Sequence, residues 1–274
     1  MHNKTIDFTI RGPRGAVRAL MVLVIVVLAV AGLVGCSSPP PKQVETELIL
    51  GTTVSITTYG RTPDGLFESL FARVQQIEER MSISEDDYST TELIAVNDAA
   101  GSSPVTVSPD TFEVVRQAVH YSRLTDGAFD VTVQPLVALW GIGTSTQWVP
   151  QPDLISQALE AVDYSRVVLN PDESSIYLPE DSMGIDVGGI AKGYAADEVA
   201  RMLREAGIDS ALLDFGGNIL TMGTKPEGSP WRIGVQVPDA SRGSYIGIAE
   251  VVDRTVVTSG TYERFFIQDG VRYH

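Results

Sequence analysis

The feature that most constrains the fold is an uncharged run near the N-terminus, Ala19–Gly35, which ends directly before Cys36. Arg11, Arg14 and Arg18 precede the run, which is the order of a signal peptide. Cys36 is the only cysteine of the chain. If the N-terminal segment is cleaved off as a signal peptide and the polar residues up to 46 are also set aside, about 230 residues remain, with no cysteine to form a disulfide. One substantial hydrophobic core must then stabilise the fold.

The end of this run, Leu33 to Cys36, has the sequence LVGC, which is the lipobox order of bacterial lipoprotein signals. The alternative is a membrane-spanning helix, which usually needs ~18 or more apolar residues. We expect residues 1–35 to be a signal peptide, Cys36 to be lipidated, and residues 36–46 to form a Pro/Ser-rich tether. This predicts a protein anchored by lipid on the extracytoplasmic side of a bacterial cell membrane.

The charge of the chain excludes one class of partner. Residues 1–35 carry four basic side chains and one acidic side chain, so the rest of the chain has a net charge of −18, against −15 for the whole. Such an acidic surface repels nucleic acid and anionic lipid headgroups. We therefore expect no nucleic-acid partner.

Hydrophobic periodicity predicts an α+β fold in a single domain, residues 47–274. Apolar stripes and capping signals predict helices within residues 64–81, from a Ser108 cap to Gly127, from an Asp153 cap, and at Ile190–Ala206. Alternating β-branched residues predict a strand or hairpin at Glu47–Gly60 and short strands at Val167–Leu169, Ile176–Leu178 and Met183–Val187.

The C-terminal third predicts a meander of strands that closes with an Asp-Gly hairpin in RFFIQDGVRYH. Because a native domain rarely ends on a strand that has just begun, we expect the chain to lack its C-terminal part. We also expect Trp140 and Trp231 to be core residues, and His120 to lie at the surface or at the edge of the core.

The chain has no phosphate-binding P-loop, no G-x-S-x-G elbow and no H-E-x-x-H motif. The candidate functional segments are therefore the turns between predicted elements in which glycines stand next to polar residues. In IDVGGIAKG, Asp186 ends a predicted strand, Gly188 and Gly189 follow, and Lys192 lies in the first turn of a predicted helix. Glycine allows close backbone approach and a helix N-terminus favours anions. The alternative is a packing turn in which Asp186 caps the helix and Lys192 is solvated.

Taken in order, these segments resemble the ApbE family of FAD:protein FMN transferases, from about Leu48 to His274. The matching segments are LGTTVSI, MSIS…TTELIAVN, TDGAFDVTVQPLVALWGIGT, IDVGGIAKGYAADEV, LLDFGGNI, WRIGVQ and TSGTYERFF…GVRYH. The resemblance implies a single T-fold-like α+β domain with mixed or antiparallel sheets and packed helices. The family usually continues with a second histidine and a segment whose Asp and Thr bind magnesium, and this chain stops before both.

The resemblance also implies an activity. The chain would be a Mg²⁺-dependent transferase that moves FMN from FAD to a Thr or Ser of a target flavoprotein through a phosphoester and releases AMP. The target would be a subunit of a membrane redox complex or an extracytoplasmic flavoprotein. Two alternatives stay open: an FAD pyrophosphatase that releases FMN and AMP, and a non-catalytic flavin-binding lipoprotein. Because two metal ligands are expected beyond residue 274, the chain itself is expected to be catalytically weak.

The resemblance further implies which residues form the site, without assigning a catalytic residue. Contacts with FAD would come from Ala128, Phe129, Asp130, Asp186 and Lys192. The main-chain carbonyl of Gly189 would be a magnesium ligand, with the remaining ligands beyond residue 274. Leu50 stands where many members have Met beside the flavin. Ser84 stands where others have Asn or Tyr, a departure that bears on whether FAD is used for transfer or hydrolysed.

Overall fold

The computed structural model describes residues 40–84, 88–238, 240, 243–261 and 264–274. The predicted signal peptide, Cys36 and the start of the predicted tether lie outside these residues, so they stay predictions. The described residues belong to one unit, which runs from Pro40 to His274. None of the helices in these residues is long and apolar enough to cross a membrane.

The main sheet has five strands in the order β1-β2-β6-β7-β10, and every neighbouring pair is antiparallel. Its strands are β1 (Lys42–Ile49), β2 (Thr52–Tyr59), β6 (Ala211–Phe215), β7 (Asn218–Met222) and β10 (Thr255–Val257). The hairpin predicted within Glu47–Gly60 is longer than expected. Residues 42–46 were predicted as tether, but each pairs with a residue of β2, from Lys42 opposite Tyr59 onward.

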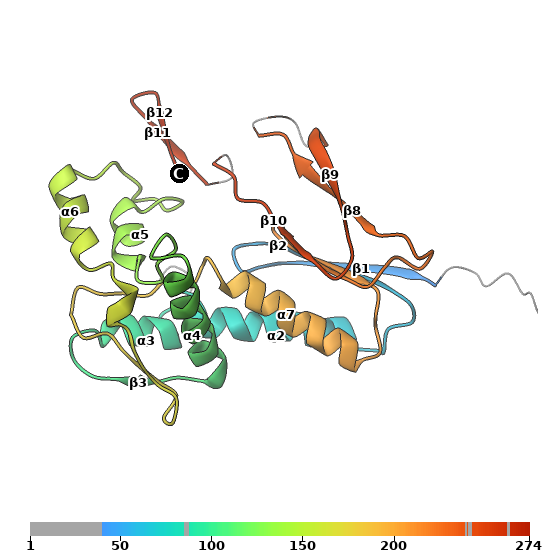
Figure 1. Ribbon diagram of the computed structural model, residues 1–274, viewed down its shortest axis with the longest axis horizontal. Coiled ribbons are helices and arrows are strands. Elements are labelled where there is room, and N and C mark those ends of the chain that lie inside the picture. The colour runs from blue at the N-terminus through green and yellow to red at the C-terminus, as the bar shows by residue number, and fades with distance from the viewer. Residues whose placement is uncertain (1–39, 85–87, 239, 241–242, 262–263) are drawn as a thin grey trace, which may run out of the picture. The chain divides into compact units, whose positions relative to one another are not determined.

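Two long helices, α2 (Leu66–Met81) and α7 (Ala191–Glu205), pack against each other and against one face of the main sheet (Figure 1). Both were predicted from apolar stripes. Residues four apart lie on the same side of a helix, and the stripes are buried in the core: Leu70, Val74 and Ile77 in α2, and Ala195, Val199 and Leu203 in α7. The hydrophobic core therefore lies between the main sheet and these helices.

The other helices are α3 (Glu92–Asp98), α4 (Pro109–Leu124), α5 (Gln134–Trp140) and α6 (Pro152–Glu160), with a 3₁₀ turn, η1 (Tyr164–Arg166). The Ser108 cap of α4 is confirmed, because its side chain accepts a hydrogen bond from the amide of Thr111. The Asp153 cap of α6 is wrong: Gln151 is the N-cap, and Asp153 lies in the first turn. The helices α3 and α5 were missed, since seven residues are too few to show a stripe.

Three smaller sheets complete the fold. They are β3 (Val105–Thr106), β5 (Ser175–Tyr177) and β4 (Val168–Asn170); the hairpin β8 (Trp231–Gln236) and β9 (Tyr245–Val251); and the hairpin β11 (Phe266–Gln268) and β12 (Val271–Tyr273). The predicted Asp-Gly turn is confirmed by the left-handed backbone of Asp269 and Gly270, with φ of 51° and 77°. The described residues therefore form the predicted α+β fold, with antiparallel sheets and packed helices.

The strand predicted at Met183–Val187 is wrong. Its apolar residues are buried, but no neighbouring strand pairs with it among the described residues. Instead, the side chain of Asn97 forms two hydrogen bonds with the backbone of Ile185, of 3.0 and 2.7 Å. The amide of Asp186 donates to the carbonyl oxygen of Val131 at 2.9 Å. These groups take the place of a partner strand for the buried segment, which leads directly into the glycine turn before α7.

Candidate functional site

The glycine turn before α7 is held by Asp186. One carboxylate oxygen of Asp186 accepts a hydrogen bond from the amide of Gly188 at 2.7 Å. The amides of Ile190 and Ala191 both donate to the carbonyl oxygen of Val187, at 2.9 and 2.8 Å. Ile190 is the N-cap of α7 and makes no side-chain capping bond. Asp186 therefore shapes the turn, as the packing-turn alternative predicted, but it does not cap the helix, and that part of the alternative is wrong.

Backbone groups are left available at this turn. Among the described residues, no hydrogen bond reaches the carbonyl oxygen of Gly189, and the amides of Lys192 and Gly193 have no acceptor. A Cβ atom at Gly189 would lie 2.9 Å from the Cε2 atom of Phe129, closer than real Cβ contacts allow. A larger residue would force the ring or the turn to move, because the ring of Phe129 packs directly on the backbone of Gly189. The free amides at the helix N-terminus can receive an anion.

Lys192 is half-buried in the first turn of α7. Burial lowers the pKa of its ammonium group, the nearby cation Arg264 lowers this pKa further, and Asp186 opposes both. Lys192, Asp186 and Arg264 are therefore close enough to interact. A guanidinium nitrogen of Arg264 also lies 3.5 Å from the carbonyl oxygen of Gly51.

Leu50 and Gly51 form the left-handed turn between β1 and β2, with φ of 56° and 62°. The contact between Arg264 and Gly51 places this turn beside the cations. Leu50 itself is partly buried against the core. The fold thus brings together three segments that are far apart in the sequence: the Leu50 turn, the start of α7, and Arg264.

An apolar cavity of about 410 Å³ adjoins Arg264. It is lined by residues in and just after α5 and by residues in and next to the C-terminal hairpin, namely Leu136, Val137, Trp140, Ile142, Arg264, Tyr273 and His274. The rings of Trp140 and Tyr273 lie 5.6 Å apart, and Tyr273 stacks on Phe266 at 5.2 Å. The prediction that Trp140 is a core residue is therefore wrong, because it forms part of an open wall.

The predictions for Trp231 and His120 are confirmed. Trp231 is a core residue, only 4% exposed, and its ring nitrogen donates to the carbonyl oxygen of Gly223 at 3.0 Å. His120 is exposed, as expected, and lies against Tyr121.

Residues of the AFD triplet lie beside the glycine turn with different roles. Phe129 is half-buried against the core and contacts Gly189, whereas Ala128 is exposed. The carboxylate of Asp130 accepts bonds from the amide and hydroxyl of Thr132, at 2.8 and 2.6 Å, and from the amide of Tyr164 at 3.1 Å. Both of its oxygens are used to tie the loop after α4 to η1. Ser84 lies just past the C-terminal end of α2, and its amide donates to the hydroxyl of Ser82 at 3.2 Å.

Sequence reasoning gave no role to Arg264, Tyr273 or Asn218. Arg264 and Tyr273 fall within segments that carried the family resemblance, but their convergence depends on the tertiary structure. Asn218 follows DFGG at the start of β7, and its side-chain oxygen is buried without a hydrogen-bond partner. The side-chain nitrogen Nδ2 of Asn218 lies 3.9 Å from the position that a Cβ atom of Gly193 would occupy. An unpaired acceptor therefore lies near the first turn of α7.

The oxygen atoms near the start of α7 can be compared with the ligands that Mg²⁺ prefers. Within the described ranges, no three His, Cys, Asp or Glu residues gather as a metal cluster. Mg²⁺ commonly takes few protein ligands and completes its shell with waters and substrate phosphates. The free carbonyl oxygen of Gly189 and the buried oxygen of Asn218 are ligand types that such an ion accepts. These residues fit an ion held largely by phosphate and water.

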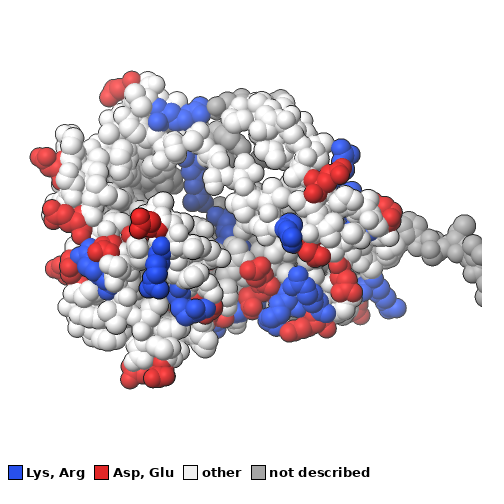
Figure 2. Space-filling view, in the orientation of Figure 1, with Lys and Arg blue, Asp and Glu red and all other residues white. Residues whose placement is uncertain are grey.

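The surface charge supports an anion site in a hollow. Figure 2 shows a face that is hollowed near its middle, where Lys or Arg atoms lie inside the hollow. Many acidic atoms lie farther out on the same face. Because the chain carries a large net negative charge, an anionic ligand is attracted only where cations are gathered.

Comparison with known proteins identifies the family. Residues 50–274 match the ApbE family. Curated relatives named FAD:protein FMN transferase include one from Treponema pallidum, 35% identical over 83% of this chain and 67% of the relative, and one from Klebsiella pneumoniae, 34% identical over 83% and 69%.

The crystal structure of the ApbE protein of Thermotoga maritima is similar with a TM-score of 0.78 and 30% identity, covering 85% of this chain and 75% of that one. The flavinyl transferase ApbE of Pseudomonas stutzeri gives 0.74 and 28%, covering 87% and 74%. The chain therefore belongs to the ApbE family, as its motifs predicted.

Proposed function

We propose that this chain is an FAD:protein FMN transferase, which attaches FMN from FAD to a Thr or Ser of a target flavoprotein. The relatives that share its fold and sequence are named as transferases, so the enzyme class follows from the family. One observation carries the proposal for this chain. The free amides at the start of α7 lie with Lys192 and Arg264 beside an aromatic cavity, which suits a ligand that is anionic at one part and flat and apolar at another.

The two halves of this site match the two chemical parts of FAD that matter for transfer. The amides of Lys192 and Gly193 and the ammonium group of Lys192 suit the diphosphate. The walls made by Trp140, Tyr273 and Leu136 suit the flavin ring, because aromatic side chains stack on flat ring systems. Leu50 lies at the turn beside Arg264, consistent with the proposed place next to the flavin.

The proposed reaction replaces the phosphoanhydride bond of FAD by a phosphoester bond to the acceptor hydroxyl. The acceptor hydroxyl oxygen bonds to the FMN-side phosphorus of FAD, the bond from that phosphorus to the bridging oxygen breaks, and AMP leaves while the hydroxyl proton passes to solvent. Phosphoryl transfer depends chiefly on positioning and on neutralising phosphate charge. Mg²⁺, when bound, would supply part of that neutralisation, with the carbonyl oxygen of Gly189 as one of its protein ligands. Lys192 and the helix amides would neutralise the rest.

The place of the reaction in the cell is also a proposal. Lipidation at Cys36 would hold the domain on the extracytoplasmic side of the bacterial membrane. The target would then be a subunit of a membrane redox complex or another extracytoplasmic flavoprotein. The acidic surface supports a protein target over a nucleic acid.

A direct assay tests the function. The full-length protein is incubated with FAD, Mg²⁺ and a partner that carries an acceptor of the type D-G-x-[ST]-G-A-T. Covalent flavin on the partner, with AMP released, is the expected result. Free FMN without covalent flavin would mean a pyrophosphatase, and stoichiometric FAD binding without AMP release would mean a flavin carrier.

The matched variant in this assay is Asp186→Ala. Loss of the carboxylate frees the Gly188 turn, and a shift of about 1 Å in a positioning group can cost roughly a hundredfold in rate. We expect transfer to fall by about a hundredfold or more while the circular dichroism spectrum is unchanged. Asp172→Ala, which removes an exposed acid from the turn between β4 and β5, is the control and should transfer normally. Unchanged transfer by Asp186→Ala would count against this assignment of the site.

A further inference from the structure

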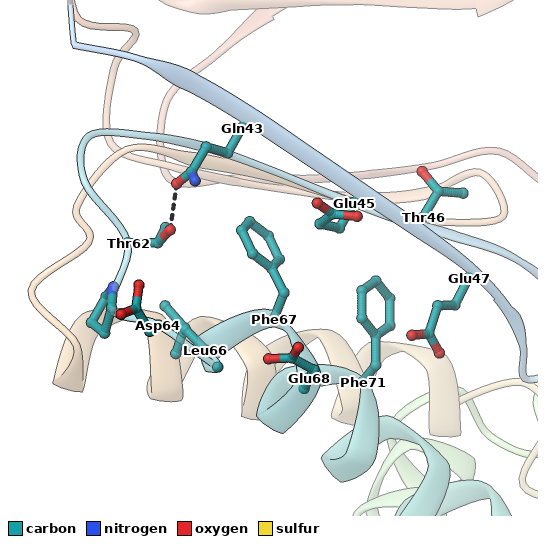
Figure 3. Close-up of a pocket in the computed structure, with 12 residues that line it drawn as sticks. Gln43, Glu45, Thr46, Glu47, Thr62, Asp64, Leu66, Phe67, Glu68 and Phe71 are labelled. Carbon is teal, nitrogen blue, oxygen red and sulfur yellow. Dashed lines mark hydrogen bonds between the residues drawn. The ribbon is translucent and has the colours of Figure 1, made fainter.

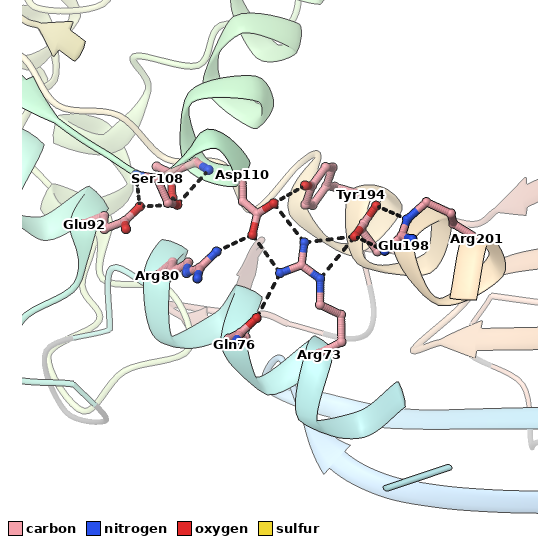
Figure 4. A network of polar contacts seen from close by, with 10 residues as sticks. Arg73, Gln76, Arg80, Glu92, Ser108, Asp110, Tyr194, Glu198 and Arg201 are labelled. Atoms are coloured by element: carbon pink, nitrogen blue, oxygen red, sulfur yellow. Dashed lines mark hydrogen bonds and ion pairs between the residues drawn. The ribbon is translucent and has the colours of Figure 1, made fainter. Parts of the chain in front are cut away.

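A network of charged side chains holds α7 from the side. Figure 4 shows Arg73 of α2 between Asp110 of α4 and Glu198 of α7. The Nη1 and Nη2 atoms of Arg73 donate to the two oxygens of Asp110, at 2.7 and 2.8 Å, and its Nε atom donates to Glu198 at 3.1 Å. One arginine therefore joins three helices.

Asp110 is the acceptor at which the network converges. It also accepts hydrogen bonds from Arg80 and, at 2.7 Å, from the hydroxyl of Tyr194. The side chains of Arg73, Asp110 and Glu198 are only 16–18% exposed. The hydrogen bonds from Arg73 lower the pKa of Asp110 to about 2, so this carboxylate is charged at neutral pH. Burial, together with the bond to Asp110, raises the pKa of Tyr194, so its hydroxyl keeps its proton and stays a donor.

The turn before α7 has hydrogen bonds of its own, but the first turn of the helix has few restraints on its rotation. Gly188 and Gly189 precede the helix, Gly193 lies in its first turn, and Ile190 provides no side-chain cap. Glycine leaves the backbone more freedom than any other residue, and a missing cap removes the usual restraint at a helix start. The rotation of α7 about its axis must therefore be set by contacts farther along the helix.

The network restrains the face of α7 that is turned away from Lys192. Tyr194 and Glu198 are four residues apart, so they project from the same side of the helix. Lys192 lies two residues before Tyr194, which at ~100° per residue is about 200° around the axis. Fixing Tyr194 and Glu198 to Arg73 and Asp110 therefore fixes the rotation of the helix that sends Lys192 to the opposite side, toward Asp186 and Arg264.

We propose that Asp110 and Tyr194 are positioning residues for the candidate site. They set the rotation and register of the first turns of α7, and they act on a bound diphosphate through Lys192 and the helix amides without touching it. The expected effect on FMN transfer rests on the proposed function. The expected effect on the backbone dynamics of α7 does not, because it can be measured without substrate.

The variant that tests this is Tyr194→Phe, which removes one hydroxyl and keeps the ring. The control is Arg116→Gln, which breaks an exposed 2.6 Å pair with Glu113 on α4. Backbone hydrogen–deuterium exchange in the full-length protein is followed at Ile190, Ala191 and Tyr194, whose amides are bonded at the helix start. We expect exchange there to speed up about tenfold in Tyr194→Phe, the effect of losing one hydrogen bond to a charged group. Arg116→Gln should leave it unchanged.

The second readout is the transfer assay. We expect kcat/KM for FAD to fall about tenfold in Tyr194→Phe while KM for the acceptor protein stays the same. A lower Tm with unchanged exchange at the start of α7 and unchanged kcat/KM would overturn the proposal and leave the network a purely structural one. A wild-type protein without transfer would contradict the proposed function, and the exchange readout would still decide this inference. If Tyr194→Phe fails to fold, Arg80→Gln takes its place, because it removes a donor to the same carboxylate from a more exposed side chain.

Discussion

Two cavities of nearly equal size differ in what they can bind. The cavity beside α5 measures about 410 Å³ and includes the cation Arg264. The second, of about 380 Å³, lies between β1 and the start of α2, and its charged lining is acidic: Glu45, Glu47, Asp64 and Glu68. In Figure 3, Phe67 and Phe71 point from α2 toward β1, which carries Glu45 and Glu47. Size alone therefore does not identify the site, and charge does.

The acidic cavity follows from the pattern of β1. Glu45 and Glu47 lie opposite Ile56 and Val54 of β2, which are fully buried, so these glutamates project from the core side of the sheet. β1 is an edge strand, and inward-facing charge on an edge strand prevents it from pairing with other chains. Protection of the sheet edge therefore explains the glutamates of β1. No such structural role explains the free amides and the half-buried Lys192 at the start of α7, whereas binding of a diphosphate would explain both.

The largest effect on FAD affinity is expected from reversing the charge at the cationic cavity. Lys192→Glu would make the start of α7 resemble the acidic cavity, replacing an attraction for phosphate by a repulsion. Because one hydrogen bond to a charged group contributes about 1.5–3 kcal/mol, we expect FAD affinity to fall more than about a hundredfold. Quenching of flavin fluorescence measures the Kd. Lys42→Glu, an exposed charge reversal on β1, is the control and should bind FAD normally; tight FAD binding by Lys192→Glu would place the diphosphate elsewhere.

A smaller effect is expected from filling the close approach at Gly189. The Cβ atom of Gly189→Ala would lie 2.9 Å from the ring of Phe129, so the ring or the turn must move. We expect kcat/KM for FAD to fall about tenfold, with partial recovery in Gly189→Ala combined with Phe129→Leu, whose shorter side chain makes room. Gly247→Ala on β9 meets no atom within 4 Å and controls for the added methyl group. Full activity in Gly189→Ala would mean that the turn does not have to keep its position for transfer.

The contrast between the cavities also shows what sequence can predict. Local signals were sufficient where neighbours in the chain make the contact: Ser108 caps α4, and the stripe of α2 is buried. The segment before Gly188 was taken for a strand because its residues are apolar, but its partner is the side chain of Asn97, which no local pattern reveals. The glycine turn and Lys192, by contrast, are neighbours in the chain, so the sequence alone could predict them as a candidate site.

Long-range convergence accounts for what the sequence did not reveal. Trp140 looked like a core residue because tryptophan is usually buried, yet it forms a cavity wall with Tyr273, which is more than a hundred residues away in the sequence. Arg264 acquires its role only because the fold brings it to the Gly51 turn and to Lys192. The Arg73 network was missed for the same reason, since its members lie on three helices.

The smallest effect is expected at the acidic cavity, and it tests whether the two cavities are functionally distinct. Glu45→Gln combined with Glu68→Gln removes two of its carboxylates while keeping their size. Because these groups lie at an edge strand and form none of the cationic site, FAD affinity and kcat/KM should stay within about twofold of wild type, as screening by salt leaves little long-range effect. The edge should instead become less protected, so light scattering should detect more self-association at high protein concentration. A tenfold change in FAD affinity would show that this cavity takes part in binding, and the assignment of the dinucleotide to the cationic cavity alone would be wrong.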